Sequence, residues 1–223
     1  MTALLVIFTV LAFVGADFLK LYIKRRRGMV ESPAADPVRA FSPVQLPSGL
    51  FVADNHSWVR LTETGELRLG LDELLTQAMG DIDVVTLPRP GTEIRRGEVF
   101  ATIRRFGHEI PVVSPVDGTV VAANEMLVAH PFDAAKDPYG NGWIASIWPT
   151  DHAESLRDLR VGERAAAWMK NEMQRLADFL TMSAAPNLAG ATLSDGARPI
   201  VGVLNALDDA ARAEFVDEFL TLD

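Results

Sequence analysis

The chain has 223 residues, enough for one domain of ordinary size and some attached segments. Its formal net charge is −9. Setting aside the five positive residues and the single acidic residue before position 28 leaves a charge of −13, which argues against a nucleic-acid partner. The absence of cysteine excludes disulfides, thiolate metal sites and thiol catalysis.

An apolar run opens the chain. Residues 4–16 are almost wholly apolar, and with the apolar residues of 18–23 the run reaches about 20 residues, the length that crosses a bilayer. Asp17 interrupts the run near its end, where a carboxylate reaches the interface or the basic residues that follow. Tyr22 and the basic residues 24–27 are typical interfacial anchors. The sequence therefore predicts a transmembrane anchor with a basic flank at residues 1–27.

The alternative for this segment is a cleaved signal peptide. Such a peptide carries its positive charge before the apolar run, whereas here the charge follows it and no A-x-A pattern precedes the arginines. The positive-inside rule then predicts a single-pass protein of a bacterial-type inner (cytoplasmic) membrane, with the N-terminus outside and the remainder cytoplasmic. Residues 28–49, which contain four prolines, are predicted to be an extended linker.

Residues 50–150 have the pattern of a small β domain. Short apolar segments at 58–61, 67–69, 82–87, 99–104, 110–113 and 119–123 are separated by glycine and proline turn signals. One short amphipathic helix is expected at 71–79. Many short strands with turns about every ten residues predict a sandwich or barrel.

Several motifs in this region resemble those of the glycine cleavage H proteins. The run D-N-H-S-W-V at 54–59 is similar to the family's opening E-H-x-W-V, and D-P-Y-G-N-G-W at 137–143 matches D-P-Y-G-x-G-W. Between them, G-L-D-E-L-L-T-Q-A-M-G-D-I at 70–82 and S-P-V-D-G at 114–118 follow in family order and spacing. The resemblance covers residues 50–150. It implies a mainly β fold, the barrel-sandwich hybrid of lipoyl domains, in which two β-sheets face each other.

The resemblance also implies where the family's chemistry would lie. H proteins carry lipoate on a lysine at a hairpin tip, seven positions before the S-P dipeptide, and the corresponding position here is Gly107. The chain has only four lysines: Lys20, Lys24, Lys136 and Lys170. Lipoylation requires an amine, so we expect no lipoate and no other cofactor.

The hairpin tip has a different composition from the family's. Acidic residues flank the lysine in H proteins, whereas Arg104, Arg105, Phe106 and His108 surround Gly107. Arginine and aromatic residues are enriched at interface hot spots, so this tip is a candidate partner-binding site. The alternative is that the arginines only solvate one edge of a strand. Asp17 is the other candidate, as a polar group that a neighbouring membrane helix would satisfy.

Other polar residues give little indication of a site. His56, His130 and His152 lack the spacing of metal ligands, since a zinc site needs three or four converging groups. Asp81 and Asp83 are explained by alternation at the start of a strand. No nucleophile, metal or phosphate-loop constellation is evident, so we expect neither a metal site nor an enzyme.

The residues beyond the β domain, 151–223, are predicted to form a helical extension. Residues 163–182 place Met169, Met173, Leu176 and Leu180 on one helical face, and 208–220 is a second helix with Ala211, Phe215 and Phe219 on one face. These apolar faces either pack on the β domain or bind another subunit.

Two classes of function remain. A retained fold, a lost lysine and an added anchor favour a non-catalytic accessory or scaffolding subunit of an integral membrane complex, such as a respiratory or photosynthetic electron-transfer complex. Its partners would be the lipid bilayer and integral membrane subunits. The alternative is a membrane-fusion-type adaptor of an export system. Such adaptors face away from the cytoplasm and carry long helical hairpins, for which this sequence has no segment.

Overall fold

The computed structural model describes residues 42, 44–105, 107–183 and 201–222, which belong to one compact unit beginning at residue 39. Within these ranges, no helix has the length and apolar character that a bilayer-spanning segment needs. The predicted anchor at residues 1–27, with Asp17, lies outside the described residues.

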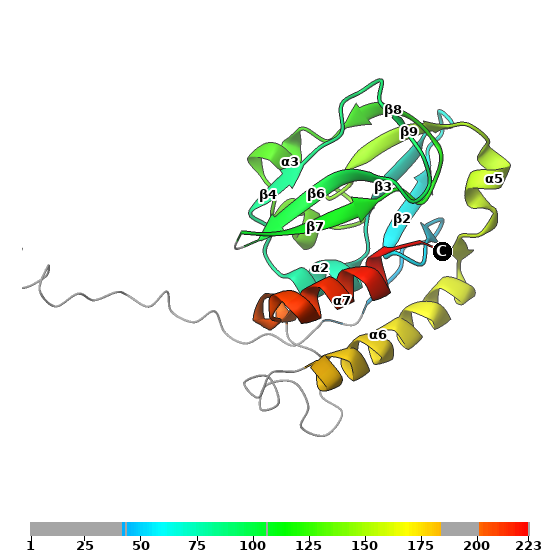
Figure 1. Cartoon of the computed structure of the whole chain (residues 1–223). Helices are drawn as coiled ribbons and strands as arrows, with labels where there is room; N and C mark the ends of the chain where they lie inside the picture. Colours follow the sequence, from blue (N-terminus) through cyan, green and yellow to red (C-terminus); the bar gives the residue numbers. More distant parts are fainter. Residues whose placement is uncertain (1–41, 43, 106, 184–200, 223) are drawn as a thin grey trace, which may run out of the picture. The chain divides into compact units, whose positions relative to one another are not determined.

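The larger of two β-sheets has seven antiparallel strands in the order β10-β1-β2-β3-β9-β8-β5. Four of them, β2, β3, β8 and β9, are labelled in Figure 1. Its strands are β1 (Phe51–Val52), β2 (Ser57–Leu61), β3 (Leu67–Leu71), β5 (Glu93–Ile94), β8 (Gly118–Ala123), β9 (Ala145–Pro149) and β10 (Arg160–Val161). Alternation along β3 points Leu67 and Leu69 into the core and Arg68 outward. This sheet therefore directs one face toward the main core, and a second, smaller buried cluster that includes Trp58 and Tyr139 covers part of the other face.

A smaller sheet closes the β domain. It contains β4 (Val84–Thr86), β6 (Val99–Arg105) and β7 (His108–Val113), in the order β4-β6-β7. Ile103 and Ile110 of this sheet share one buried cluster with Leu69 and Ile147 of the larger sheet. The two sheets thus enclose a common apolar core, and the expectation of a mainly β domain followed by helices is confirmed.

The helices are α2 (Glu73–Met79), α3 (Met126–Ala129), α4 (Asp133–Lys136), α5 (His152–Arg157), α6 (Glu163–Ser183) and α7 (Asp209–Leu220), with a 3-10 turn η1 (Val203–Ala206). The helix expected at 71–79 begins at Glu73, because Leu71 completes β3 and Asp72 caps α2 by accepting a hydrogen bond from the Leu75 amide. Helices α3, α4 and α5 were not predicted, and each is only four to six residues long.

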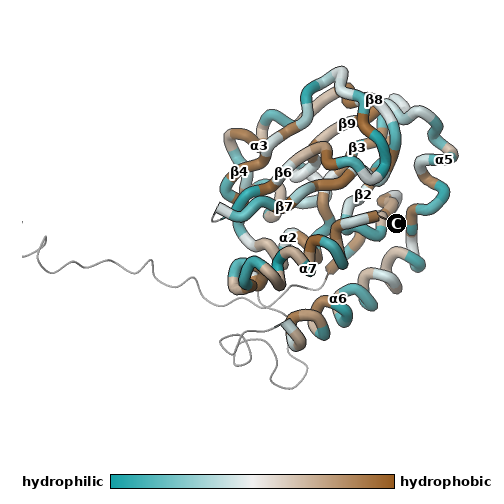
Figure 2. Tube along the Cα trace, viewed as in Figure 1, coloured by the Kyte–Doolittle hydropathy of each residue, from teal (hydrophilic) through white to brown (hydrophobic). Residues whose placement is uncertain are grey.

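The C-terminal helices pack on the β domain. Phe179 of α6 and Phe215 and Phe219 of α7 belong to the same buried cluster as the strands, and their rings contact one another at centroid distances of 4.8–5.9 Å. Helix α7 contacts β7, and η1 contacts α2. Figure 2 shows apolar residues on these helices as well as on the strands. The sequence had left open whether these helical faces pack on the β domain or bind another subunit, and the structure places them on the β domain.

Candidate functional site

The hairpin between β6 and β7 ends in a tight turn. Arg105 pairs with His108 across the ladder, and Gly107 lies in the turn between them. Gly107 has φ of +82°, in the left-handed region that glycine adopts without strain. An added Cβ at Gly107 would meet nothing within 4 Å. The position that the sequence motifs predict to correspond to the family's lipoyl lysine is therefore an open hairpin tip that carries no side chain.

Three of the five predicted partner-binding residues lie together at this tip, namely Arg104, Arg105 and His108. Phe106 and Asp17 fall outside the described residues, so their part in the site stays a prediction. The side chain of Arg104 is 48% exposed and lies 3.9 Å from the carboxylate of Glu109, its partner across the strands. His108 on β7 lies 3.9 Å from Asp209 at the start of α7.

Arg105 is held much more firmly than Arg104. Its side chain is only 16% exposed and lies within 3.7 Å of Asp81 and 3.5 Å of Asp83, just before β4. These two aspartates, which sequence alternation alone explained, therefore neutralise an arginine of the hairpin. Arg104 and His108 are the residues of the tip whose side chains a partner can reach with the least disturbance of the fold.

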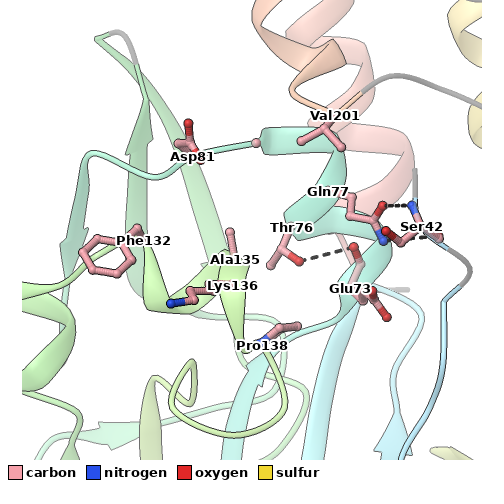
Figure 3. Close-up of a pocket in the computed structure, with 11 residues that line it drawn as sticks. Ser42, Glu73, Thr76, Gln77, Asp81, Phe132, Ala135, Lys136, Pro138 and Val201 are labelled. Carbon is pink, nitrogen blue, oxygen red and sulfur yellow. Dashed lines mark hydrogen bonds between the residues drawn. The ribbon is translucent and has the colours of Figure 1, made fainter. Parts of the chain in front are cut away.

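Neither described lysine replaces the missing one. Lys170 lies on α6, and Lys136 is the last residue of α4, beside an open groove of about 510 Å³ between α2 and α4. Figure 3 shows the Lys136 side chain along one wall of this groove, directed toward Phe132 and away from Glu73. Both amines thus lie on helices, far in the chain from the hairpin turn that a lipoyl lysine occupies.

The domain also contains a buried ionic cluster that was not predicted from the sequence. His56 is 2% exposed; its Nδ1 lies 2.7 Å from Oδ2 of Asp72, and its Nε2 lies 3.6 Å from Oε2 of Glu172. The imidazole is enclosed by the rings of Trp168 and Phe219, at centroid distances of 5.2 and 6.1 Å. The cluster joins the start of β2 and the cap of α2 to both C-terminal helices.

The backbone positions this histidine in an uncommon way. His56 has φ of +60°, the only described residue other than glycine with positive φ. Asp72 uses one carboxylate oxygen to cap α2 and the other to accept from His56. Arg175 donates from Nη1 to both carboxylate oxygens of Glu172, at 3.0 and 3.3 Å, and it also binds Glu218 of α7. A chain of alternating charges therefore fastens α6 and α7 to the β domain.

The environment fixes the protonation of the cluster. Burial by itself lowers the pKa of His56, but the charge of Asp72 and hydrogen bonds to Asp72 and Glu172 outweigh it and raise this pKa to about 9. Burial raises the pKa of Glu172, but the hydrogen bond and charge of His56, with those of Arg175, bring it below its ordinary value. The cluster is therefore an imidazolium between two carboxylates near neutral pH.

We expect the stability of the domain to fall in alkaline solution. The folded-state pKa of His56 exceeds its ordinary 6.5, so its stabilisation is full below pH 6.5 and is lost as the pH rises through about 9. The pKa difference corresponds to about 3 kcal/mol of unfolding free energy. The lowered pKa of Glu172 adds a second loss, as the pH falls through its folded-state pKa.

Denaturant unfolding at about pH 6, 8 and 10 measures this dependence. The His56→Asn variant is the control, because it lacks the titrating group, and its profile should be much flatter over the same range, with only a small fall near pH 10 from Tyr139, whose pKa is raised by burial. A wild-type stability that is the same at pH 6 and pH 10 would show that folding does not raise the pKa of His56.

The signal for this cluster was present on α6. Its buried face comprises Ala165, Met169, Glu172, Leu176, Phe179 and Leu180, so one carboxylate stands within an otherwise apolar stripe. A buried charge requires a partner of opposite charge, and His56 supplies it from more than 100 residues away in the chain. Among the described residues no His, Asp and Glu side chains converge as a metal site requires.

Comparison with known proteins agrees with this geometry. Residues 50–172 match the family model of the glycine cleavage H-protein. A probable glycine cleavage system H protein of Pyrococcus abyssi is 33% identical over 57% of this chain and 94% of its own length. The H protein of Coprothermobacter proteolyticus is 39% identical over 46% of this chain and 81% of its own.

A solved structure gives the same result. The glycine cleavage system H protein of Mycobacterium marinum aligns with a TM-score of 0.50 and 26% identity, over 56% of this chain and 99% of that protein. The matched region holds the two sheets and the β6–β7 hairpin, and the family match ends at position 172 within α6. The chain therefore belongs to the glycine cleavage H-protein family.

Proposed function

We propose that this protein is a non-catalytic accessory or scaffolding subunit of an integral membrane complex, whose H-protein domain no longer carries lipoate. The observation that carries the proposal is Gly107, which occupies the turn where the family presents its lipoyl lysine. H proteins are carriers rather than catalysts, so a member without its attachment residue keeps a folded surface but loses the group that moves between enzymes.

The chemistry of the residues at the hairpin tip supports the loss of lipoate. Lipoate is attached through an amide to a lysine amine; glycine offers no nucleophile, arginine stays protonated, and an acylated imidazole is not stable. Helix α7 also contacts β7, and its first turn places Asp209 beside His108. The hairpin is therefore tied to the C-terminal extension, an arrangement suited to a fixed contact surface.

The membrane part of the proposal rests on the sequence of residues 1–27. An apolar run of bilayer length, followed by five basic residues at positions 20 and 24–27, supports a single-pass anchor with residues 28–223 on the cytoplasmic side. A lone helix with one appended domain offers no transport path of its own. Asp17 supports association of that helix with others, since a carboxylate near hydrocarbon needs a polar partner.

We predict that the protein extracted from its own membranes in mild detergent migrates as a stoichiometric member of a larger complex. The anchor should supply most of the affinity and the exposed face of the hairpin a second contact. Arg104→Glu should weaken that second contact, more so at low salt, where repulsion from an acidic partner is least screened.

Native electrophoresis with densitometry of the co-migrating subunits makes this measurement. Arg104 is the residue to change, because Arg105→Glu would also place a third carboxylate beside Asp81 and Asp83. Arg89→Glu, an exposed arginine in the β4–β5 loop, is the matched control. Migration of the wild type alone, as a monomer, contradicts the accessory-subunit proposal. Unchanged binding by Arg104→Glu contradicts only the role of the hairpin.

A further inference from the structure

The outer face of the larger sheet, on the side away from the core, bears two arginines in direct opposition. Arg60 of β2 and Arg68 of β3 are register partners in the antiparallel ladder, so their side chains leave the same face about 5 Å apart. Like charges placed opposite each other across two strands repel and destabilise a sheet. On a strongly acidic chain, this is a costly arrangement for the fold alone.

Neither arginine is neutralised within the described residues. The ion pairs of the domain involve other arginines, and no carboxylate lies within 4 Å of Arg60 or Arg68. Glu66, which directly precedes β3, accepts a hydrogen bond from Ser146 Oγ at 2.6 Å and makes no ion pair with either arginine. The two guanidinium groups therefore keep their full hydrogen-bonding capacity.

Tryptophan rings support both arginines. The guanidinium carbon of Arg60 lies 5.6 Å from the ring centre of Trp58, and that of Arg68 lies 5.1 Å from the ring centre of Trp143. Trp58 is itself fixed against Gly70, where an added Cβ would come within 2.6 Å of the indole. The arginines are thus held over rigid aromatic surfaces, which reduces the entropy lost when they bind a partner.

The same face continues to an exposed tryptophan. Trp148 of β9 is 51% exposed and lies opposite Thr119 of β8, on the face that also bears Ser146 and Arg68. We infer that the outer face of β2, β3 and β9, with Arg60, Arg68 and Trp148, binds an acidic segment of a partner protein. Paired guanidinium groups match carboxylates, and arginine with tryptophan is the composition of interface hot spots.

An extended segment is the form of partner that fits. Alternate residues of a strand face one side at about 7 Å spacing, which two long arginine side chains rooted about 5 Å apart can reach. The surface is formed by three neighbouring strands of a sheet, whose spaced side chains suit an extended protein segment. The inference is independent of the membrane anchor, and the assay below needs no membrane complex, so failure of either proposal is distinguishable.

The test uses the full chain in mild non-ionic detergent and a fluorescently labelled peptide of alternating Glu and Thr, with the Gln-Thr peptide as its neutral match. Anisotropy should show binding of the Glu-Thr peptide that weakens as salt is added. The Arg60→Gln/Arg68→Gln variant should bind at least about tenfold more weakly. Arg89→Gln/Arg95→Gln, which removes the same charge elsewhere on the surface, should bind as the wild type does.

Circular dichroism checks that each variant is folded, and Arg68→Gln alone, at an exposed side chain, serves if the double variant unfolds. Equal binding of the Glu-Thr and Gln-Thr peptides overturns the inference, as does equal weakening by the control variant. Binding to vesicles containing anionic lipid, in the absence of peptide binding, also overturns it, because the face would then recognise lipid.

Discussion

Replacing His56 with asparagine should destabilise the domain by about 3–5 kcal/mol, the loss typical of removing one member of a buried ion pair. Asparagine tolerates the left-handed backbone found at this position, so the change tests the charge rather than the conformation. Without the imidazolium, Asp72 and Glu172 remain as two buried carboxylates. Among the described residues, the only cation that still pairs with either of them is the guanidinium of Arg175, which binds Glu172.

Equilibrium denaturation, followed by tryptophan fluorescence, gives this difference. Asp54→Asn is the matched control, because it breaks the exposed ion pair with Arg160 and should change stability by less than about 1 kcal/mol. Glu172→Met should lie between the two, since His56 keeps Asp72 as its partner. A loss below about 1 kcal/mol for His56→Asn would show that the cluster does not hold α6 and α7 to the β domain.

Installing a lysine at the hairpin tip should convert the protein into a lipoyl acceptor. The position is open, and a side chain with φ of +82° costs about 1–2 kcal/mol at a turn that contributes little to the core. We expect no transfer of lipoate to the wild type by a lipoate–protein ligase, and measurable transfer to Gly107→Lys. Adding Arg104→Glu should increase transfer, because H proteins have acidic residues beside their lysine.

Mass spectrometry of the ligase reaction provides the measurement, and tryptic mapping locates the modified residue. The control is Thr86→Lys, which adds an exposed lysine to β4 of the same small sheet, away from a turn. Transfer to that control, or to wild-type Lys136, would contradict the idea that only a lysine at the hairpin tip can accept lipoate.

Much of the fold could be predicted because the signals for strands, turns and helices lie within short stretches of the sequence. Turn glycines and the family motifs located β6, β7 and β8 within one or two residues, and the periodicity of 163–182 and 208–220 located α6 and α7. The absent lysine could be read by counting back from Ser114. The short helices α3, α4 and α5 could not be predicted, since a segment of four to six residues is too short to show a helical period.

The charge pairing of the site could not be predicted, because it depends on contacts between distant segments. Arg105 appeared as a free basic residue until the fold brought Asp81 and Asp83 beside it. His56 was set aside only as a metal ligand, and its ionic partner could not be identified because Glu172 lies on a helix far along the chain. In both cases tertiary packing supplied the opposite charge, and only the carboxylate within the apolar face of α6 gave warning of it.

The intact mass of the protein purified from its own host tests most directly whether this H-protein domain has lost its lipoate. We predict a mass equal to that of the sequence, apart from processing at the N-terminus, in cells that lipoylate their other carriers. A lipoyl adduct on Lys136, Lys170 or any other residue would contradict the account.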